Sequence, residues 1–274
     1  MNQGVTLASA RVRFDLDSRA DNVTLIRAGM SSLGSCFGLD DALLSDMRTA
    51  VSEACNNVVV HAYEGATGPM TVVVEILGSG ARVLIRDHGT GIRPSAQSSQ
   101  HMGLGLGIMG SLADSIQVTN LPECGTEVWM GFCLPEKHKN FPEGRLYEWQ
   151  ISELPQRGTE ISIWLEPLSL IGPVFGRMLR SYAAAWWFTA DGVDSFQAVA
   201  AALGEYALKA ARQAVGIVVS AAPRRLQVVI GPLPQADVSA DPQRLALQKL
   251  VAELTEVEIE GHTNLGFVLS EERA

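Results

Sequence analysis

The stretch EACNNVVVHAY, residues 53–63, decides the fold, because it is an apolar helical pattern interrupted by polar residues at a fixed spacing. Glu53, Asn57 and His61 follow one another at intervals of four. Four residues advance an α-helix by about 40° beyond a full turn, so these side chains predict one slanting polar stripe. Burying the carboxylate costs several kcal/mol unless it meets a partner or a wet cleft. A solvated helix face is the simpler interpretation of the same stripe.

The flanking sequence predicts an α+β domain around this helix. Apolar residues recur at intervals of three and four from Asp40 to Ala62, and acidic Asp40 and Asp41 suit the positive end of the helix dipole. Alternating patterns and Gly-rich turns predict strands on both sides. We expect strands at 12–16, 71–77, 82–86, 115–120 and 126–134, and helices at 21–36, 40–62 and 103–114. This order predicts helices layered on one face of a mixed sheet.

Two glycine-containing segments lie where these strands and helices meet. Asp87, Gly89 and Gly91 alternate at the end of a strand. A carboxylate there can accept a hydrogen bond from an amino group such as that of adenine, and glycine lets the backbone approach a flat ring. Further on, a glycine at every second position from 103 to 107 precedes a helix, where amide groups and the helix dipole favour phosphate. A dinucleotide site is disfavoured, because the spacing is GxGxG and no βαβ unit surrounds it.

Together these segments resemble the boxes of the GHKL ATPase superfamily, and in particular of the anti-sigma-factor serine kinases. The four boxes occur in order at 53–63, 87–91, 103–106 and 125–126. The resemblance implies a two-layer α/β sandwich of the GHKL (Bergerat) type that binds ATP and Mg2+. Too few residues precede the first box for the phosphoacceptor domain of a sensor histidine kinase.

The resemblance also implies a role for each matching residue. Glu53 would be the catalytic general base, Asn57 would bind the nucleotide and complete the magnesium shell, and Asp87 would bind adenine. His61 would pack or hydrogen-bond at the helix end. The remaining nucleotide-binding residues would be Gly89, Gly91, Gly103, Leu104, Gly105, Leu106, Gly107 and Thr126, with residues 93–102 as a lid over ATP.

The second half of the chain is interpreted as a degenerate copy of the first. We expect an ATP-binding domain at 1–136, a linker at 137–158 and a GHKL-like domain without a nucleotide site at 159–274. Its expected strands are 161–165, 216–220, 226–230, 257–260 and 265–269, and its expected helices are 171–187, 195–214 and 242–254. In this alignment Asn57 corresponds to Lys209, Asp87 to Ile230, and the glycine run to residues 243–247, while Glu205 stands opposite Glu53. Two unrelated α+β units with the same element order are the alternative.

Composition limits the remaining function classes. The net charge of −9 and the absence of a basic run argue against nucleic acid as a partner. We expect no secretory leader, no membrane span and four reduced cysteines, and therefore a cytoplasmic protein. The prediction is a bacterial anti-sigma-factor-type regulator that phosphorylates Ser or Thr on a small protein antagonist and sequesters a sigma factor. It would be a monomeric pseudo-dimer or a homodimer. A non-catalytic ATP/ADP-dependent switch and a scaffold with a dead site are the alternatives.

Overall fold

The computed structural model describes residues 9–91, 99–122, 124–134, 160–211, 214–233, 242–259 and 261–271. The chain divides into two compact units. The first comprises Met1–Val23 and Phe37–Glu153, and the second comprises Thr24–Cys36 and Leu154–Ala274. One helical segment of the first half therefore belongs to the second unit, and the linker expected at 137–158 lies outside the described residues.

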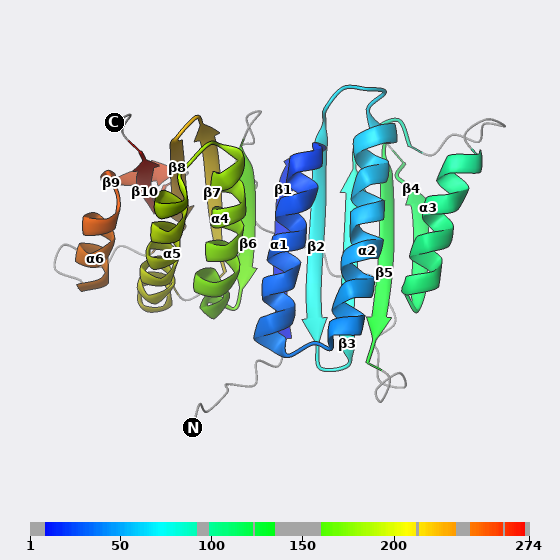
Figure 1. Ribbon diagram of the computed structural model, residues 1–274, viewed down its shortest axis with the longest axis horizontal. Coiled ribbons are helices and arrows are strands. Elements are labelled where there is room, and N and C mark those ends of the chain that lie inside the picture. Colours follow the sequence, from blue (N-terminus) through cyan, green and yellow to red (C-terminus); the bar gives the residue numbers. More distant parts are fainter. Residues whose placement is uncertain are drawn as a thin grey trace. The chain divides into compact units, whose positions relative to one another are not determined.

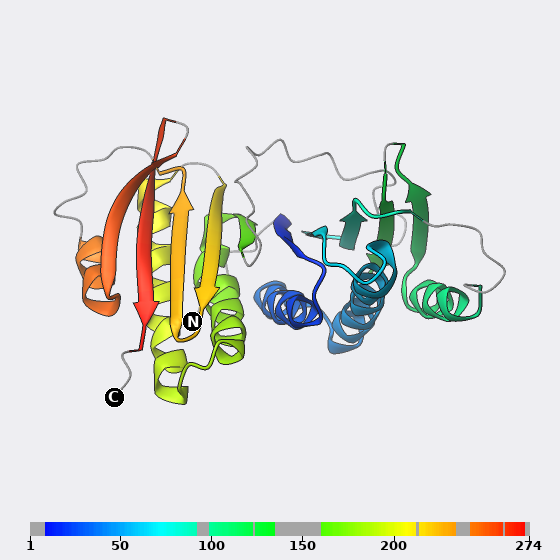
Figure 2. The same ribbon diagram turned by 90° about the horizontal axis from the view of Figure 1, so that it is seen from above.

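The first unit is an antiparallel sheet with helices on one face, which confirms the predicted α+β fold class. Its elements are β1 (Ser9–Asp17), α2 (Asp41–Asn57), η1 (Val58–Ala62), β2 (Pro69–Leu77), β3 (Gly80–Asp87), α3 (Ser99–Leu112), β4 (Ser115–Asn120) and β5 (Thr126–Cys133). The helix between β1 and α2, α1 (Ala20–Phe37), belongs mostly to the second unit. The strand order is β4-β5-β3-β2-β1. Figures 1 and 2 show α2 and α3 on the same face of these strands. Each described pair of strands is antiparallel, whereas we expected a mixed sheet.

Alternation along β1 explains which face of this sheet the helices cover. Val12, Phe14 and Leu16 are fully buried, and the residues between them are charged. On the charged face, Arg11 donates to Glu75 of β2 at 2.6 Å, and Arg82 of β3 reaches the other oxygen of the same carboxylate. Side chains alternate between faces along a strand, so a slip of one residue would exchange the apolar and charged sets. The register that places the site residues is therefore strongly specified.

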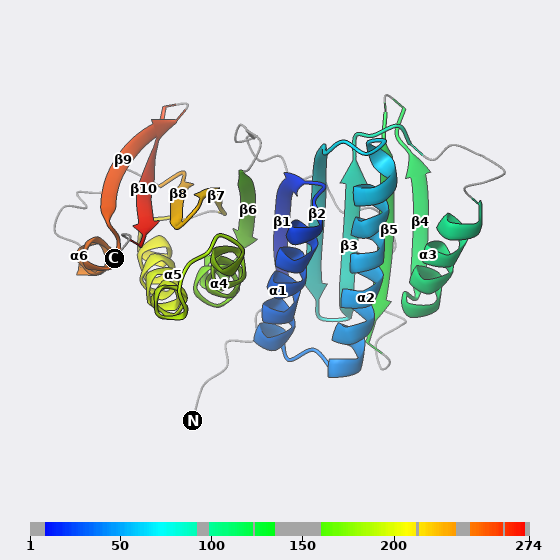
Figure 3. The same ribbon diagram turned by 45° about the horizontal axis from the view of Figure 1, so that its top comes forward.

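The second unit repeats the topology of the first. Its elements are β6 (Ile161–Glu166), η3 (Leu168–Leu170), η4 (Ile171–Phe175), α4 (Gly176–Ala185), α5 (Ala190–Ala210), β7 (Val215–Ala222), β8 (Arg225–Gly231), α6 (Pro242–Leu250), β9 (Glu253–Ile259) and β10 (His262–Ser270). The strand order β6-β7-β8-β10-β9 mirrors that of β1 to β5, and each described pair is again antiparallel. Figure 3 shows α4 and α5 on one face of these strands.

Three helix boundaries differ from the predicted ones. α5 begins at Ala190 rather than at 195, because Thr189 caps it by accepting a hydrogen bond from Gly192 N at 3.2 Å. α6 ends at Leu250 rather than at 254, since pairing with β10 draws residues from Glu253 onward into β9. α3 begins at Ser99 rather than at 103, so the glycine run lies inside a helix. Of the predicted lid at 93–102, residues 93–98 lie outside the described part.

No helix in the described ranges is both long and apolar enough to span a membrane.

Candidate functional site

Asp87 is the most constrained polar residue among the predicted site residues. It ends β3 and is only 4% exposed. Its Oδ1 accepts main-chain hydrogen bonds from Gly89 N at 2.8 Å and from Thr126 N at 3.2 Å. Burial raises the pKa of the Asp87 carboxyl, and these hydrogen bonds counteract part of that effect. A buried acceptor of fixed orientation can recognise a donor group on a ligand.

Two glycines let the chain close around this carboxylate. A Cβ on Gly89 would lie 2.1 Å from the carbonyl oxygen of Ala62, and a Cβ on Gly125 would lie 2.1 Å from that of Asp87. Gly125 also has a φ of 102°, which side-chain-bearing residues rarely adopt. Any larger residue at either position would force these segments apart.

The end of the second helix is fastened to the same loop. After Asn57 the α-helix widens into a π-helical turn, η1, and Ala62 O at its end accepts a hydrogen bond from Thr90 N at 2.9 Å. The hydroxyl of Tyr63 accepts from His88 N at 2.9 Å and donates to Pro69 O. Such π-turns are frequent at functional sites, where they re-aim the side chains around them.

Glu53 and Asn57 face the glycine run. A Cβ on Gly105 of α3 would lie 2.6 Å from Oε1 of Glu53, and 3.2 Å and 3.5 Å from the amide nitrogen and oxygen of Asn57. Both side chains are partly buried, and a Cβ at position 105 would displace the carboxylate of Glu53. His61 is exposed and lies in the π-helical turn η1.

The glycine run itself is helical in this structure. In an α-helix only the first four amide groups are free of intrahelical partners. Because α3 begins at Ser99, the amides of Gly103, Gly105 and Gly107 lie beyond those four. Leu106 is partly buried, and a Cβ on Gly107 would meet nothing within 4 Å. Wrapping a phosphate with these amides would therefore require the first turns of α3 to open.

Sequence reasoning overlooked two residues that shape the site. Tyr63, to which we assigned no role, links the end of the second helix to the loop after Asp87 through its hydrogen bond from His88 N. Cys124 donates its thiol hydrogen to Gly89 O and so lies beside the loop that holds Asp87. Gly91, with a φ of 72°, places its Cα hydrogens near the side-chain oxygen of Asn120. The motif letters indicated Tyr63, whereas nothing in the sequence singled out Cys124.

Residues 16–132 match the family model of the histidine kinase-like ATPase domain. Two relatives are similar to part of the chain: the serine-protein kinase RsbW of Bacillus mycoides, 28% identical, and that of Bacillus cereus strain G9842, also 28% identical. Each alignment spans 122 residues, which is 39% of this chain and 76% of the relative. Among solved structures, crystal form I of TP0453 aligns with 97% of this chain and 92% of that one at 11% identity and a TM-score of 0.40.

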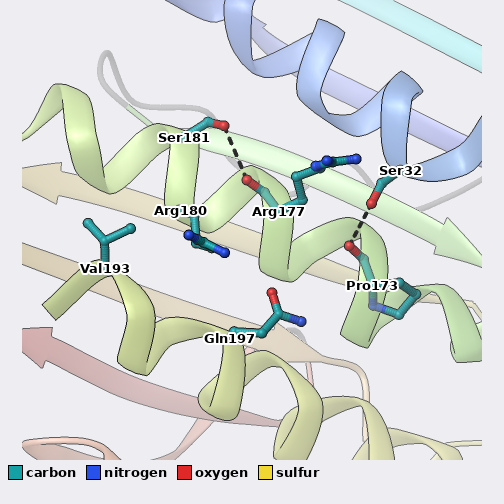
Figure 4. A pocket seen from close by; sticks show the side chains of 7 residues that line it. All are labelled: Ser32, Pro173, Arg177, Arg180, Ser181, Val193 and Gln197. Carbon is teal, nitrogen blue, oxygen red and sulfur yellow. Dashed lines mark hydrogen bonds between the residues drawn. The ribbon is translucent and has the colours of Figure 1, made fainter. Parts of the chain in front are cut away.

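Among the described residues of the second unit, the counterparts of Asn57 and Asp87 carry neither an amide nor a carboxylate. Glu205 and Lys209, the counterparts of Glu53 and Asn57, are exposed on α5. At the hairpin turns Leu77 pairs with Gly80, and Ala222 pairs with Arg225. Matching the two turns aligns Gly80 with Arg225. Asp87 then corresponds to Pro232, two residues beyond the expected Ile230. Neither residue carries a carboxylate. The second unit instead has a hollow of about 590 Å3 whose described lining is Ser32, Pro173, Arg177, Arg180, Ser181, Val193 and Gln197 (Figure 4).

Proposed function

We propose that the first unit binds Mg-ATP and transfers its terminal phosphoryl group to a Ser or Thr hydroxyl of a small protein antagonist. The observation that carries this proposal is the close approach of Gly105 to the Glu53–Asn57 pair, where an added Cβ would displace Glu53. A general base and an amide ligand therefore face the backbone of the segment expected to hold phosphates. The serine-kinase names of the matching relatives support the choice of a protein hydroxyl as acceptor.

The donor set of this pocket suits Mg-ATP. An amide oxygen such as that of Asn57 is a ligand type that magnesium accepts, and the ion would neutralise charge on the phosphates. Asp87, held by Gly89 and Thr126, would accept a hydrogen bond from the adenine amino group. Among described residues no group of three or more His, Cys, Asp or Glu could hold a metal ion by itself. This agrees with the usual binding of Mg2+ through one or two side chains together with substrate phosphates.

In this proposal the protein contributes mainly position and proton transfer. Phosphoryl transfer depends on aligning donor and acceptor and on balancing charge. Glu53 would accept the proton of the attacking hydroxyl, while Asn57 and the opened glycine run would hold the phosphate end. Residues 93–102 would cover the nucleotide, and Gly89 and Gly91 would shape the base pocket.

A nucleotide-dependent switch without transfer is favoured by one observation. The glycine run is already helical, so phosphate binding would rearrange α3, which packs on α2. The two forms of α3 could then present different surfaces to an antagonist or a sigma factor. Transfer of radiolabel from ATP to a purified partner distinguishes the kinase from the switch.

We infer that the second unit is a degenerate copy that takes the place of a second subunit. Its matching topology and the exposed positions of Glu205 and Lys209 support this inference. Calorimetric titration with ATP, with and without magnesium, should give one site per chain, and light scattering should give a monomer. Two sites per chain, or an obligate homodimer built through the first units, would contradict it. Failure of ATP to bind would contradict the proposed function itself.

A further inference from the structure

The hydroxyl of Tyr63 stands between two strands at the point where they separate. The ladder between β2 and β3 ends with Met70 opposite Asp87, so the next residues along the two strands are Pro69 and His88. There, His88 N donates to the Tyr63 hydroxyl at 2.9 Å, and the hydroxyl donates to Pro69 O. The phenol therefore bridges the main chains of the two strands immediately beyond the ladder.

One side of this bridge is fixed to the sheet. A Cβ on Gly68 would lie 2.3 Å from Cε1 of Tyr63, so the ring rests directly on the main chain at Gly68. Gly68 N donates to Oγ of Ser18 at 3.1 Å, and Ser18 N donates to Gly68 O at 2.8 Å. Burial raises the pKa of the Tyr63 phenol, so the hydroxyl stays protonated at neutral pH and can donate to Pro69 O. The phenol thus has a fixed position from which it holds His88.

The other side of the bridge is the loop that carries the proposed acceptor for the nucleotide base. His88 directly follows Asp87, whose Oδ1 accepts hydrogen bonds from Gly89 N and Thr126 N. Those bonds orient the carboxylate within its own loop. The hydrogen bond from His88 N to Tyr63 joins this loop to the residue after the π-helical turn η1, and so it determines where the acceptor lies in the pocket.

The second unit, which has Pro232 where the first has Asp87, holds the corresponding loop differently. The same match of the two hairpin turns aligns His88 with Leu233. Leu233 N donates to Thr263 O of β10 at 2.8 Å, so its loop is fastened to a neighbouring strand. In the first unit the corresponding N–H donates to a phenol instead. The bridge therefore occurs in the unit that has the carboxylate.

A carboxylate in a fixed position can distinguish the two purine bases. Adenine presents an amino group, which donates to a carboxylate, where guanine presents an oxygen, which the carboxylate repels. Guanine has donor groups beside that oxygen, so a carboxylate on a loop that can shift could accept from them instead. Selectivity therefore requires an acceptor that cannot move aside. Asp87 is only 4% exposed, and its loop is held by the bridge to Tyr63.

We propose that Tyr63 is a positioning residue that makes the nucleotide site selective for ATP over GTP. Its hydroxyl holds His88 so that the Asp87 carboxylate meets the amino group of adenine and rejects the oxygen of guanine. This inference rests on the proposed function, because it concerns the base of the same nucleotide. It adds the purine that the site excludes and the side chain responsible for the exclusion.

Tyr63→Phe in the full chain tests the proposal, because it removes the hydroxyl and keeps the ring on Gly68. Calorimetric titration should show affinity for Mg-ATP about tenfold lower and affinity for Mg-GTP unchanged or higher, so that their ratio falls at least about tenfold. Phosphoryl transfer should show a raised KM for ATP at nearly unchanged kcat, since Glu53 is not disturbed. The matched control Tyr182→Phe, which removes a hydroxyl from α4 of the second unit, should leave the ratio unchanged.

A purely structural role of the hydroxyl would give a different result. Tyr63→Phe would then lower the melting temperature but preserve the ratio of ATP to GTP affinity, and this outcome would overturn the proposal. Amide hydrogen exchange gives a second readout that needs no nucleotide. The His88 amide should exchange slowly in the unaltered chain and faster in Tyr63→Phe, whereas fast exchange in the unaltered chain would overturn the proposal even if the variant did not fold.

Nucleotide binding by the unaltered chain separates this proposal from the proposed function. Equal affinities for ATP and GTP would overturn the selectivity while leaving Mg-ATP binding intact. Failure to bind either nucleotide would overturn the proposed function itself, and the role of Tyr63 with it.

Discussion

Gly105 and Glu53 are in close approach, because a Cβ on Gly105 would lie 2.6 Å from Oε1 of the glutamate. The clashing atom is the far end of a flexible side chain, so the fold can accommodate an added methyl group by moving Glu53. Moving Glu53 would disturb the geometry needed for phosphoryl transfer, because Glu53 is the proposed general base. A substitution of Gly105 should therefore lower phosphoryl transfer without lowering stability.

Gly105→Ala should leave the protein as stable as before or stabilise it, since alanine is favoured over glycine inside a helix by about 0.5–1 kcal/mol. Displacement of Glu53 should lower phosphoryl transfer by about 100-fold, the usual scale for misplacing a catalytic group by 1 Å. Gly110→Ala is the matched control, because its Cβ would meet nothing within 4 Å on the same helix. Equal activity of the two variants would show that the close approach of Gly105 to Glu53 does not matter for transfer.

Glu53→Ala should abolish transfer while ATP still binds. General-base catalysis contributes about 100- to 10,000-fold, so transfer should fall at least 100-fold by that reasoning. Calorimetry should show nearly unchanged affinity for Mg-ATP, and Asn56→Ala, an exposed neighbour on α2, should retain both properties. Full transfer by Glu53→Ala would refute the assignment of Glu53 as base.

Asp87→Asn should weaken ATP binding by about 10- to 100-fold, because one hydrogen bond to a charged acceptor is worth about 1.5–3 kcal/mol. The asparagine oxygen can still accept from Gly89 N and Thr126 N, so the loop should keep its shape. Calorimetric titration measures the loss, and circular dichroism confirms the fold. ATP affinity equal to that of the unaltered protein would remove Asp87 from the base pocket.

The same substitution has a consequence for stability against pH. Burial raises the folded-state pKa of Asp87 above 3.8, so folding favours the protonated carboxyl. Stability from this group is fully present below pH 3.8 and declines as the pH rises through the folded pKa. Thermal melts should show Asp87→Asn gaining stability relative to the unaltered protein across that interval. A difference that does not vary with pH would contradict the raised pKa.

Strand positions and the helix around residues 53–63 were predictable, because periodicities of two and of about 3.6 are local properties of the sequence. The π-turn at 58–62 was not, since it accompanies hydrogen bonds to Thr90 and His88, which lie far along the chain. The early start of α3 at Ser99 was missed because the preceding polar residues have no apolar period.

The motifs selected the candidate site residues, but they did not predict how these residues are arranged in the structure. Box letters placed Glu53, Asn57 and Asp87 in order, whereas the contact between Gly105 and Glu53 depends on how α3 packs on α2. The left-handed turn at Trp187 was hidden for a different reason. Glycine is the usual signal of such a turn, and here the sequence offers tryptophan.

Glu271 should contribute to stability only above the acidic range. Hydrogen bonding from the Thr189 side chain, together with the Thr189 N–H and the charge of Arg224, lowers the pKa of this carboxyl below 4.5. A lowered folded-state pKa means that the stabilisation is present above pH 4.5 and is lost as the pH falls through the folded pKa. Because the carboxyl remains accessible to solvent, screening keeps the effect small. Glu271→Gln should therefore melt slightly below the unaltered protein at pH 7, and the two should converge in acid, while Glu258→Gln, an exposed acid on β9, should show no such convergence. A Glu271→Gln deficit that persists unchanged into the acidic range would contradict this account of the contact between Glu271 and Thr189.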